Sequence, residues 1–384
     1  MPPSSQFTFA EVAKLRQQGD LWIVVDNKVY DLSKFANIHP GGTSVLLDEE
    51  VAGKDATEAF FGLHRHEVLL TPRYSRLVIG TIAGGKSLIK VPAPGDMSEI
   101  PYAEPSWLTK GYHSPYYSDR HRKFQTWLRK WSEEHFIPEA WECEESGKQP
   151  SQKGVDMQAK YGILAMRMGP GRHLKGLKLA DGLVEPEEFD YFHELIVNQE
   201  LCRGTARGFQ DGSIGGMVIG FPPIMNFASK QVQAKVMPEI ISGKKYICLA
   251  ISEAFAGSDV AGLRCKATKS ADGTYWTING TKKWITNGTF SDYFVVACKT
   301  SKGLTVFLVE RGPGVETKPI KTSYSSTAGT AYVTFDDVRV PSGNMLGKEN
   351  KGLMVVLSNF NHERWVLVCC AARNQRTIVE ECLK

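Results

Sequence analysis

The sequence has no apolar run that approaches the ~18 residues needed to cross a membrane as a helix. Its eight cysteines form no Cys-x-x-Cys pair and show no metal-ligand spacing, which indicates reduced thiols rather than a disulfide framework or a zinc site. The formal net charge is only +4, without a long basic block, so the composition does not support nucleic-acid binding.

Targeting signals and a phosphate-binding fingerprint are missing as well. Residues 1–6 show neither a secretory signal nor a basic amphipathic presequence. Gly212-Ser213-Ile214-Gly215-Gly216 and Gly169-Pro170-Gly171 match a glycine-rich phosphate loop only weakly, and we interpret both as turns. We therefore expect a soluble, intracellular protein, and the cytoplasm, the peroxisome and the mitochondrial matrix all stay open as its compartment.

The pattern of apolar residues changes along the chain, and 384 residues exceed what one hydrophobic core usually serves. We therefore expect a multidomain α+β protein. The expected segments are a mixed α+β domain at 7–85, a linker at 86–112 that is rich in glycine, proline and lysine, helices at 113–245, strands at 246–345, and helix again at 350–384.

The first domain contains His39-Pro40-Gly41-Gly42 and, later, Leu63-His64. Two imidazoles that fill both axial positions of a haem iron make an electron carrier rather than an oxygen binder. Over residues 7–85 the sequence closely resembles a cytochrome b5 haem-binding domain, and the resemblance implies that His39 and His64 are the axial ligands of a haem b. The interval between them is slightly longer than the family's, so His66 is a rival for the second ligand.

Three later segments carry a second resemblance: Ile251 to Gly262, Asn279 to Gly288, and Phe335 to Pro341. Within the second, Asn279-Gly280 is also a hairpin signal. From about residue 115 to the end, the chain closely resembles the acyl-CoA dehydrogenase flavoproteins. This implies an N-terminal helical domain at 113–245, a middle β domain of barrel or sandwich type at 246–345, and the start of a C-terminal helical bundle.

The same resemblance implies how FAD is bound. Ser252 and Ser258 would donate hydrogen bonds to the flavin and its pyrophosphate, with Ser252 standing where many relatives have threonine. Trp284 would cover the isoalloxazine ring, and Thr286 would bond near N5, the atom that receives hydride. Phe255 replaces a more usual glycine in the first of these loops.

Removing the α-proton of an acyl thioester requires a carboxylate that is desolvated enough to raise its pKa. Glu363 matches the position of the base in the isovaleryl- and long-chain branches of the family. Ser258, Asn361 and Arg364 match positions near the substrate. The implied reaction forms a 2-enoyl-CoA, as Glu363 takes the α-proton and the β-hydrogen leaves as hydride to FAD.

The domain pairing resembles fungal fusions, and it suggests two electron acceptors: the chain's own haem, docked through the linker, or an electron-transferring flavoprotein. The C-terminal bundle looks truncated, and we expect a homo-oligomer if it is completed. Two alternatives stay open: a non-catalytic chain in which only the haem domain works, or an oxidase of acyl-CoA or nitroalkanes. Fatty-acid β-oxidation and fungal secondary-metabolite synthesis are both compatible with the sequence, which does not set the acyl chain length.

Overall fold

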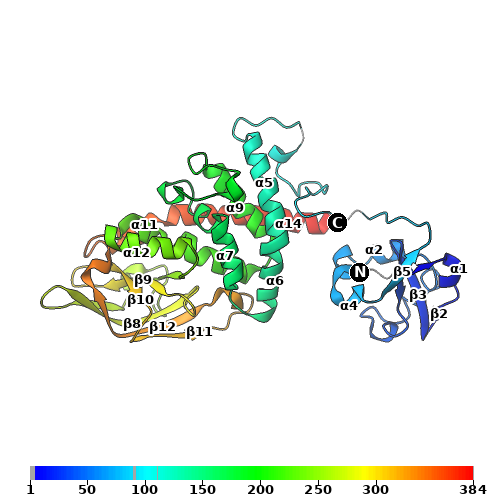
Figure 1. The fold of residues 1–384 in the computed structure, drawn as a ribbon. Helices are drawn as coiled ribbons and strands as arrows, with labels where there is room; N and C mark the ends of the chain where they lie inside the picture. The colour runs from blue at the N-terminus through cyan, green and yellow to red at the C-terminus, as the bar shows by residue number, and fades with distance from the viewer. Residues whose placement is uncertain (1–4, 90–91, 110, 384) are drawn as a thin grey trace. The chain divides into compact units, whose positions relative to one another are not determined.

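The computed structural model describes residues 5–89, 92–109 and 111–383. These residues form two compact units, with the boundary between Pro92 and Ala93. Figure 1 shows unit 1 (up to residue 92) as a small sheet with short helices, and unit 2 (residues 93–383) as helices packed on a larger sheet. None of the helices in the described ranges is both long enough and apolar enough to span a membrane.

The described part of unit 1 is built on a five-stranded sheet in the order β1-β5-β4-β3-β2. Alternation along β3 places Leu21, Ile23 and Val25 in one buried cluster and Val24 in another, as expected for a strand covered on both faces. The elements are β1 (Gln6–Phe7), α1 (Phe9–Val12), β2 (Arg16–Gln17), β3 (Asp20–Val25), β4 (Lys28–Asp31), η1 (Ala36–Ile38), α2 (Thr57–Phe61), α3 (His66–Leu70), α4 (Pro72–Ser75) and β5 (Val78–Ile82).

Much of the segment that we expected to be a linker is attached to one unit or the other. In unit 1, the Asp26 carboxylate accepts hydrogen bonds from the N–H groups of Leu88 (2.6 Å) and Ile89 (3.1 Å) and from the Ser87 hydroxyl. In unit 2, the N–H of Gly95 donates to Glu133 (2.8 Å). Residues 87–89 and 95 are therefore held by side chains of their own units.

Residues 103–107 of that segment pack into the helical part of unit 2. Ala103 and Trp107 are buried, and Glu104 pairs with the fully buried Arg129 at 2.5 Å. Arg129 also pairs with Glu200 at 2.8 Å. The helices are η2 (Ser106–Leu108), α5 (Asp119–Trp131), the π-helix η3 (Ser132–Phe136), α6 (Ile137–Ser146), α7 (Gln152–Lys160), α8 (Ile163–Met166), α9 (Tyr191–Leu201), η6 (Cys202–Gly204), α10 (Arg207–Ile214), the π-helix η7 (Gly215–Gly220), α11 (Pro222–Phe227) and α12 (Lys230–Ile241).

The described strands of unit 2 form one eight-stranded sheet, in the order β11-β12-β8-β7-β9-β10-β13, with β6 parallel to β9. The strands are β6 (Ile247–Ala250), β7 (Lys266–Lys269), β8 (Tyr275–Ile285), β9 (Tyr293–Lys299), β10 (Leu304–Glu310), β11 (Val315–Pro319), β12 (Ala331–Pro341) and β13 (Met345–Leu346).

Both faces of the central strands are buried. Tyr293, Val295 and Ala297 of β9 pack in the cluster that includes α11 and α12, whereas Phe294 and Val296 pack in a second cluster. In the second cluster Phe294 meets Phe335 of β12 edge to face, although β9 and β12 are not neighbours in the sheet. The sheet therefore curls on itself, which confirms the barrel or sandwich architecture expected for this domain.

The predicted hairpin at Asn279-Gly280 is wrong, because both residues lie inside β8. Gly280 has φ +142°, and a Cβ there would lie 2.7 Å from the Cα of Cys265. Across the sheet, β12 has a register shift between Phe335 and Val338, and the Asn279 side chain bonds Asp337 in it. The pair thus serves a bulge and a close backbone approach rather than a turn.

The predicted turn at Gly212 to Gly216 is also wrong, because these residues continue from α10 into the π-helix η7. A Cβ on Gly215 would lie 2.7 Å from Thr286, and one on Gly216 would lie 3.2 Å from the carbonyl oxygen of Ile247. The glycines let this helix lie directly against β6 and the residues after β8. Gly169 to Gly171 is a non-helical bend, as predicted.

The chain continues after β13 as α13 (Gly352–Ser358) and α14 (Phe360–Leu383). Val366 and Cys370 of α14 pack against Cys202, Ile214 and Val218. Farther along, Arg373 donates to the carbonyl of Ala103 at 3.0 Å. Helix α14 is thereby joined to η6, α10 and η7, and its first turn carries the residue expected to act as base.

Candidate functional site

The two histidines expected to bind haem lie side by side in unit 1, with ring centroids 6.0 Å apart. Nδ1 of His39 lies 3.0 Å from the carbonyl oxygen of Gly42, and Nδ1 of His64 lies 3.2 Å from that of Phe60. A carbonyl only accepts, so each Nδ1 carries the proton and each Nε2 keeps its lone pair for a metal. Two imidazoles bound to one metal ion, with bonds of ~2 Å and ~1 Å from each nitrogen to its ring centre, would have their ring centroids ~6 Å apart. The separation seen between His39 and His64 is similar.

The turn after His39 suits this geometry. Gly42 has φ +86°, and a Cβ on Gly41 would lie 2.8 Å from Cε1 of the His39 ring. Ile38 and Leu63, the residues before the two histidines, are 58% and 81% exposed. The residues present therefore fit a haem: two oriented imidazoles, a glycine turn that makes room for one ring, and apolar surface beside them.

His66, the rival ligand, begins α3 and stacks on Phe61 with centroids 6.3 Å apart. Both of its ring nitrogens are buried without a hydrogen-bond partner among the described residues. The ring that contacts His39 is that of His64. His64 therefore stays our preferred second ligand, and His66 is the residue against which it has to be tested.

In unit 2, the two segments expected to hold FAD are joined by a buried ion pair. Lys282 lies 2.8 Å from Glu253, with 0% and 4% of their side chains exposed, and it also donates to the carbonyl of Ile251. Glu253 accepts further hydrogen bonds from the N–H groups of Arg264 and Cys265. Burial acts to raise the pKa of Glu253, but the hydrogen bonds from Lys282 and the backbone outweigh it and lower this pKa.

This pair sets the expected flavin residues next to one another. The N–H of Lys283 donates to the carbonyl of Ser252 at 2.9 Å, so Ser252 lies beside the end of β8 that leads to Trp284 and Thr286. Ser258 is exposed in the same loop as Ser252, just before the short helix η8 (Val260–Gly262). The structure thus places Ser252 beside Lys283, which precedes Trp284, whereas Thr286 lies next to Gly215 and Ser258 lies farther along the loop.

The backbone at the end of β8 is strained. Trp284 has φ +66° and Asn287 has φ +65°, which is unusual for residues other than glycine, particularly a bulky aromatic one. The Trp284 ring is 54% exposed, whereas Thr286 between the two is half-buried. Oδ1 of Asn287 is buried without a partner among residues 5–89, 92–109 and 111–383. An exposed tryptophan, a hydroxyl and an orphaned amide oxygen fit the edge of a bound ring system.

Phe255, which replaces a more usual glycine, is 74% exposed, and the guanidinium of Arg264 lies over its ring at 4.6 Å. The Phe255 ring therefore stacks on Arg264 and adds an exposed aromatic side chain to the surface of this loop.

Glu363 lies in the first turn of α14 and is half-buried. Its Oε2 is buried and has no hydrogen-bond partner in the described part of the chain. Burial raises the pKa of this carboxyl, and the nearby Arg364 and His362 oppose the shift only in part. A desolvated carboxylate with one free oxygen is what a general base requires.

The two other expected substrate contacts on this helix are exposed. Asn361 is exposed, and the exposed Arg364 has its guanidinium over the Phe360 ring at 5.3 Å. Arg364 therefore offers a cation at the surface beside Glu363.

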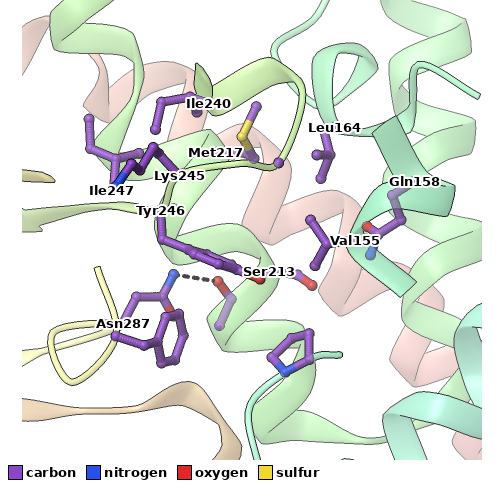
Figure 2. A pocket seen from close by; sticks show the side chains of 15 residues that line it. Val155, Gln158, Leu164, Ser213, Met217, Ile240, Lys245, Tyr246, Ile247 and Asn287 are labelled. Atoms are coloured by element: carbon purple, nitrogen blue, oxygen red, sulfur yellow. Dashed lines mark hydrogen bonds between the residues drawn. The ribbon is translucent and has the colours of Figure 1, made fainter. Parts of the chain in front are cut away.

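A small apolar cavity of about 60 Å³ is lined in part by residues of α10 and η7. Figure 2 shows Tyr246 and Asn287 on one side of it and Val155 and Gln158 of α7 on the other, and the Asn287 amide donates to the carbonyl of Gly212 at 2.8 Å. Cofactor sites usually enclose several hundred Å³, so this cavity is a packing gap behind the residues that follow β8.

His121, Asp190 and His193 place possible metal-ligand atoms within 4.8 Å of one another. Their contacts instead serve helix ends. Nδ1 of His121 accepts from the N–H of Ser118, so its protonated Nε2 donates to Asp190. Asp190 also caps α9 by accepting from the N–H groups of Phe192 and His193. We therefore interpret the cluster as a double helix cap.

Several residues that shape these sites were missed in the sequence. Lys282 and Asn287 lie within Asn279 to Gly288, one of the segments that resemble the family. Their place in this segment is the sequence signal that points to them. Asn359 donates to the carbonyl of Val218 at 2.8 Å, and His362 lies 2.6 Å from Glu194. No local pattern predicts these last two contacts, because their partners are more than 140 residues away.

Comparisons with known proteins agree with both resemblances. Residues 8–99 match the model of the cytochrome b5-like haem/steroid binding domain. Residues 118–244 match the N-terminal domain of acyl-CoA dehydrogenase, and residues 248–338 match its middle domain.

The chain is 39% identical over 303 residues to acyl-CoA dehydrogenase apdG of Emericella nidulans, covering 75% of this chain and 69% of that protein. It is 35% identical over 282 residues to acyl-CoA dehydrogenase AFT10-1 of Alternaria alternata, covering 71% and 64%. Among solved structures, butyryl-CoA dehydrogenase of Megasphaera elsdenii is 25% identical with a TM-score of 0.58, covering 67% and 66%. The chain thus spans about two thirds of the length of these relatives. It belongs to the acyl-CoA dehydrogenase family of oxidoreductases and carries a cytochrome b5-like domain before the dehydrogenase domains.

Proposed function

We propose that this chain is an FAD-dependent acyl-CoA dehydrogenase in which Glu363 removes the α-proton of an acyl-CoA to give a 2-enoyl-CoA. The observation that carries this proposal is that Oε2 of Glu363 is buried and has no hydrogen-bond partner among the described residues, while burial raises the pKa of this carboxyl. The reaction is balanced if the α-proton goes to this oxygen while the β-hydrogen leaves with its electron pair as hydride.

We propose that Ser252, Ser258, Trp284 and Thr286 hold FAD. The hydrogen bond between Lys283 and Ser252 and the strained φ of Trp284 support this assignment, since both order the segment in which these residues lie. Bound FAD would supply the hydride acceptor. The Glu253–Lys282 pair joins the two segments that carry these residues.

The proposed substrate contacts are Ser258, Asn361 and Arg364, all of which are exposed. Arg364 would meet the negatively charged phosphates of the coenzyme A portion, because its guanidinium has no carboxylate partner among the described residues and lies over Phe360. Desolvation of Glu363 by the bound acyl chain would raise its basicity further.

We also propose that unit 1 binds haem b through His39 and His64. The ring spacing of 6.0 Å and the two Nδ1 hydrogen bonds support axial ligation. Haem would supply a one-electron acceptor, so electrons from the dehydrogenation would pass to it within the chain or to an electron-transferring flavoprotein.

The deciding experiment is an absorption spectrum of the purified protein, reconstituted with FAD and haem, before and after anaerobic addition of a panel of acyl-CoAs. Flavin bleaching followed by reduced-haem bands is expected. Glu363→Gln should bind FAD and show no bleaching. If FAD is bound and no acyl-CoA bleaches it, the dehydrogenase proposal is wrong and unit 1 is left as the working part. Rapid peroxide formation in air would instead indicate an oxidase.

A further inference from the structure

A buried carboxylate–imidazole pair lies next to the proposed base. His362 Nε2 is 2.6 Å from Oε1 of Glu194, and 24% and 0% of the two side chains are exposed. Glu194 comes from α9, whereas His362 is in the first turn of α14 and directly precedes Glu363. This contact is slightly shorter than the ~2.7–2.9 Å of a charge-assisted N–H···O hydrogen bond, which is stronger than a neutral one.

The buried carboxylate of Glu194 has His362 as its side-chain partner. A Cβ on Gly169, which has φ +74°, would lie 2.5 Å from the other oxygen of Glu194, so the glycine bend closes over it. That oxygen, Oε2, has no hydrogen-bond partner within the described ranges. A buried carboxylate is costly unless it is paired, so the imidazole is the group that allows Glu194 to ionise there.

The same turn of α14 is held at a second point. The Asn359 side chain is buried and donates to the carbonyl of Val218 in η7. Its own carbonyl accepts the N–H of Glu363 at 3.0 Å. The backbone of Glu363 is thus anchored to η7 on one side and, through His362, to α9 on the other.

The charges around Glu363 can be named element by element. The titratable groups on α14 are His362 and Arg364. Those on α9 are Glu194 and Tyr191, and Tyr191 lies edge-on to Trp365. The sequences of α13 and η7 contain no titratable side chain. Burial raises the pKa values of Glu194 and of Glu363, and the His362 charge lowers both.

We propose that Glu194 positions His362, and through it the first turn of α14, so that Glu363 is presented to the substrate as a carboxylate. Glu194 and His362 are positioning residues, and Glu363 is the group that touches the substrate. This inference rests on the proposed dehydrogenase function. It adds the Glu194–His362 pair, whose members are 168 positions apart in sequence, as residues on which the protonation of the base depends.

The test is the pH profile of anaerobic flavin reduction in the FAD-loaded full chain, for His362→Gln and Glu194→Gln. The control is His135→Gln, which changes an exposed histidine on η3. Loss of the His362 side chain or of its Glu194 partner should move the midpoint of the pH profile up by about one pH unit, so that the rate below the midpoint falls about tenfold. Acyl-CoA affinity should change little, and His135→Gln should behave like the unmodified protein.

A uniform loss of rate at every pH, without a shift of the midpoint, would mean that the pair is only structural and would overturn the proposal. If single variants fold poorly, the double variant Glu194→Leu/His362→Leu removes both charges together and should still show the shifted midpoint. Hydrogen exchange gives a readout without turnover: residues 360–365 should exchange faster in Glu194→Gln. If the unmodified protein reduces no flavin, the dehydrogenase proposal fails, and unchanged exchange in Glu194→Gln separately overturns the anchoring role.

Discussion

Lys282 and Glu253 form an ion pair at 2.8 Å that is almost completely buried, and it joins β8 to the loop after β6. The pair takes no part in the proposed chemistry. Its place between Ser252 and Trp284 means that the proposed FAD site depends on a contact whose loss leaves a charge in the protein interior.

Lys282→Met should therefore destabilise unit 2 by about 3–5 kcal/mol, because it leaves the Glu253 carboxylate buried without its cation. FAD content per chain should fall as well, measured from the flavin absorbance after gel filtration. Lys269→Met, which breaks the half-exposed pair with Glu349, is the matched control and should change little. Normal stability and flavin content in Lys282→Met would show that the pair does not hold the two segments.

The haem ligands can be assigned with three alanine variants of the haem-reconstituted protein. His39→Ala and His64→Ala should lose the six-coordinate spectrum because each removes one axial imidazole. His66→Ala should keep it. The reverse result for His64 and His66 would show that the residue opening α3 is the second ligand, and that the ring pair seen at 6.0 Å rearranges when haem binds.

Gly280→Ala should destabilise the sheet of unit 2 by about 1–3 kcal/mol, since a side chain there meets backbone and the residue would hold an unfavourable φ. Denaturant unfolding measures the change. Gly343→Ala places its Cβ in open space and is the control. Equal stability of the two variants would contradict the close approach of β8 to Cys265.

The stability of unit 2 should depend on pH through Glu200. Burial acts to raise the pKa of this carboxyl, but the charge and hydrogen bonds of Arg129 lower it from 4.5 to about 2. Since the folded pKa lies below the unfolded one, the stabilisation is present above about pH 4.5 and is lost as the pH falls toward 2.

Glu200→Gln should remove this contribution, on the order of 3 kcal/mol at neutral pH, and flatten the acid limb of the unfolding free energy. Glu188→Gln, which alters an exposed pair with Arg120, should leave the acid limb unchanged. An unaltered acid limb in Glu200→Gln would assign the acid sensitivity to other carboxylates.

Elements that depend on a contiguous sequence motif could be predicted from the sequence. The His-Pro-Gly-Gly turn, the segments around Ser252 and Trp284, and the helix that carries Glu363 are all contiguous motifs, and their elements lie where expected. The errors have one physical origin. Asn279-Gly280 and Gly212 to Gly216 resemble turns because glycine is permissive. Here glycine is required instead by the close approach of Cys265 to Gly280 and of Thr286 to Gly215, which are residues separated in sequence.

The same reason explains what was missed at the proposed catalytic site. Glu363 could be named from its motif, yet its environment comes from Glu194 on α9 and Val218 on η7. A side chain's protonation depends on what packs around it, and a single sequence without an alignment does not reveal which distant residues those are.

The hydrogen bonds of Asp26 to residues 87–89 have a consequence for electron transfer. With residues up to Ile89 held by unit 1 and Gly95 held by unit 2, the chain between the two attachments is only a few residues long. Six residue steps from Ile89 to Gly95 reach about 21 Å at full extension. If unit 1 binds haem as proposed, such a short tether would keep the local concentration of this electron acceptor high. By holding residues 87–89, Asp26 shortens the free chain that would link a haem-bearing unit 1 to the proposed flavin site.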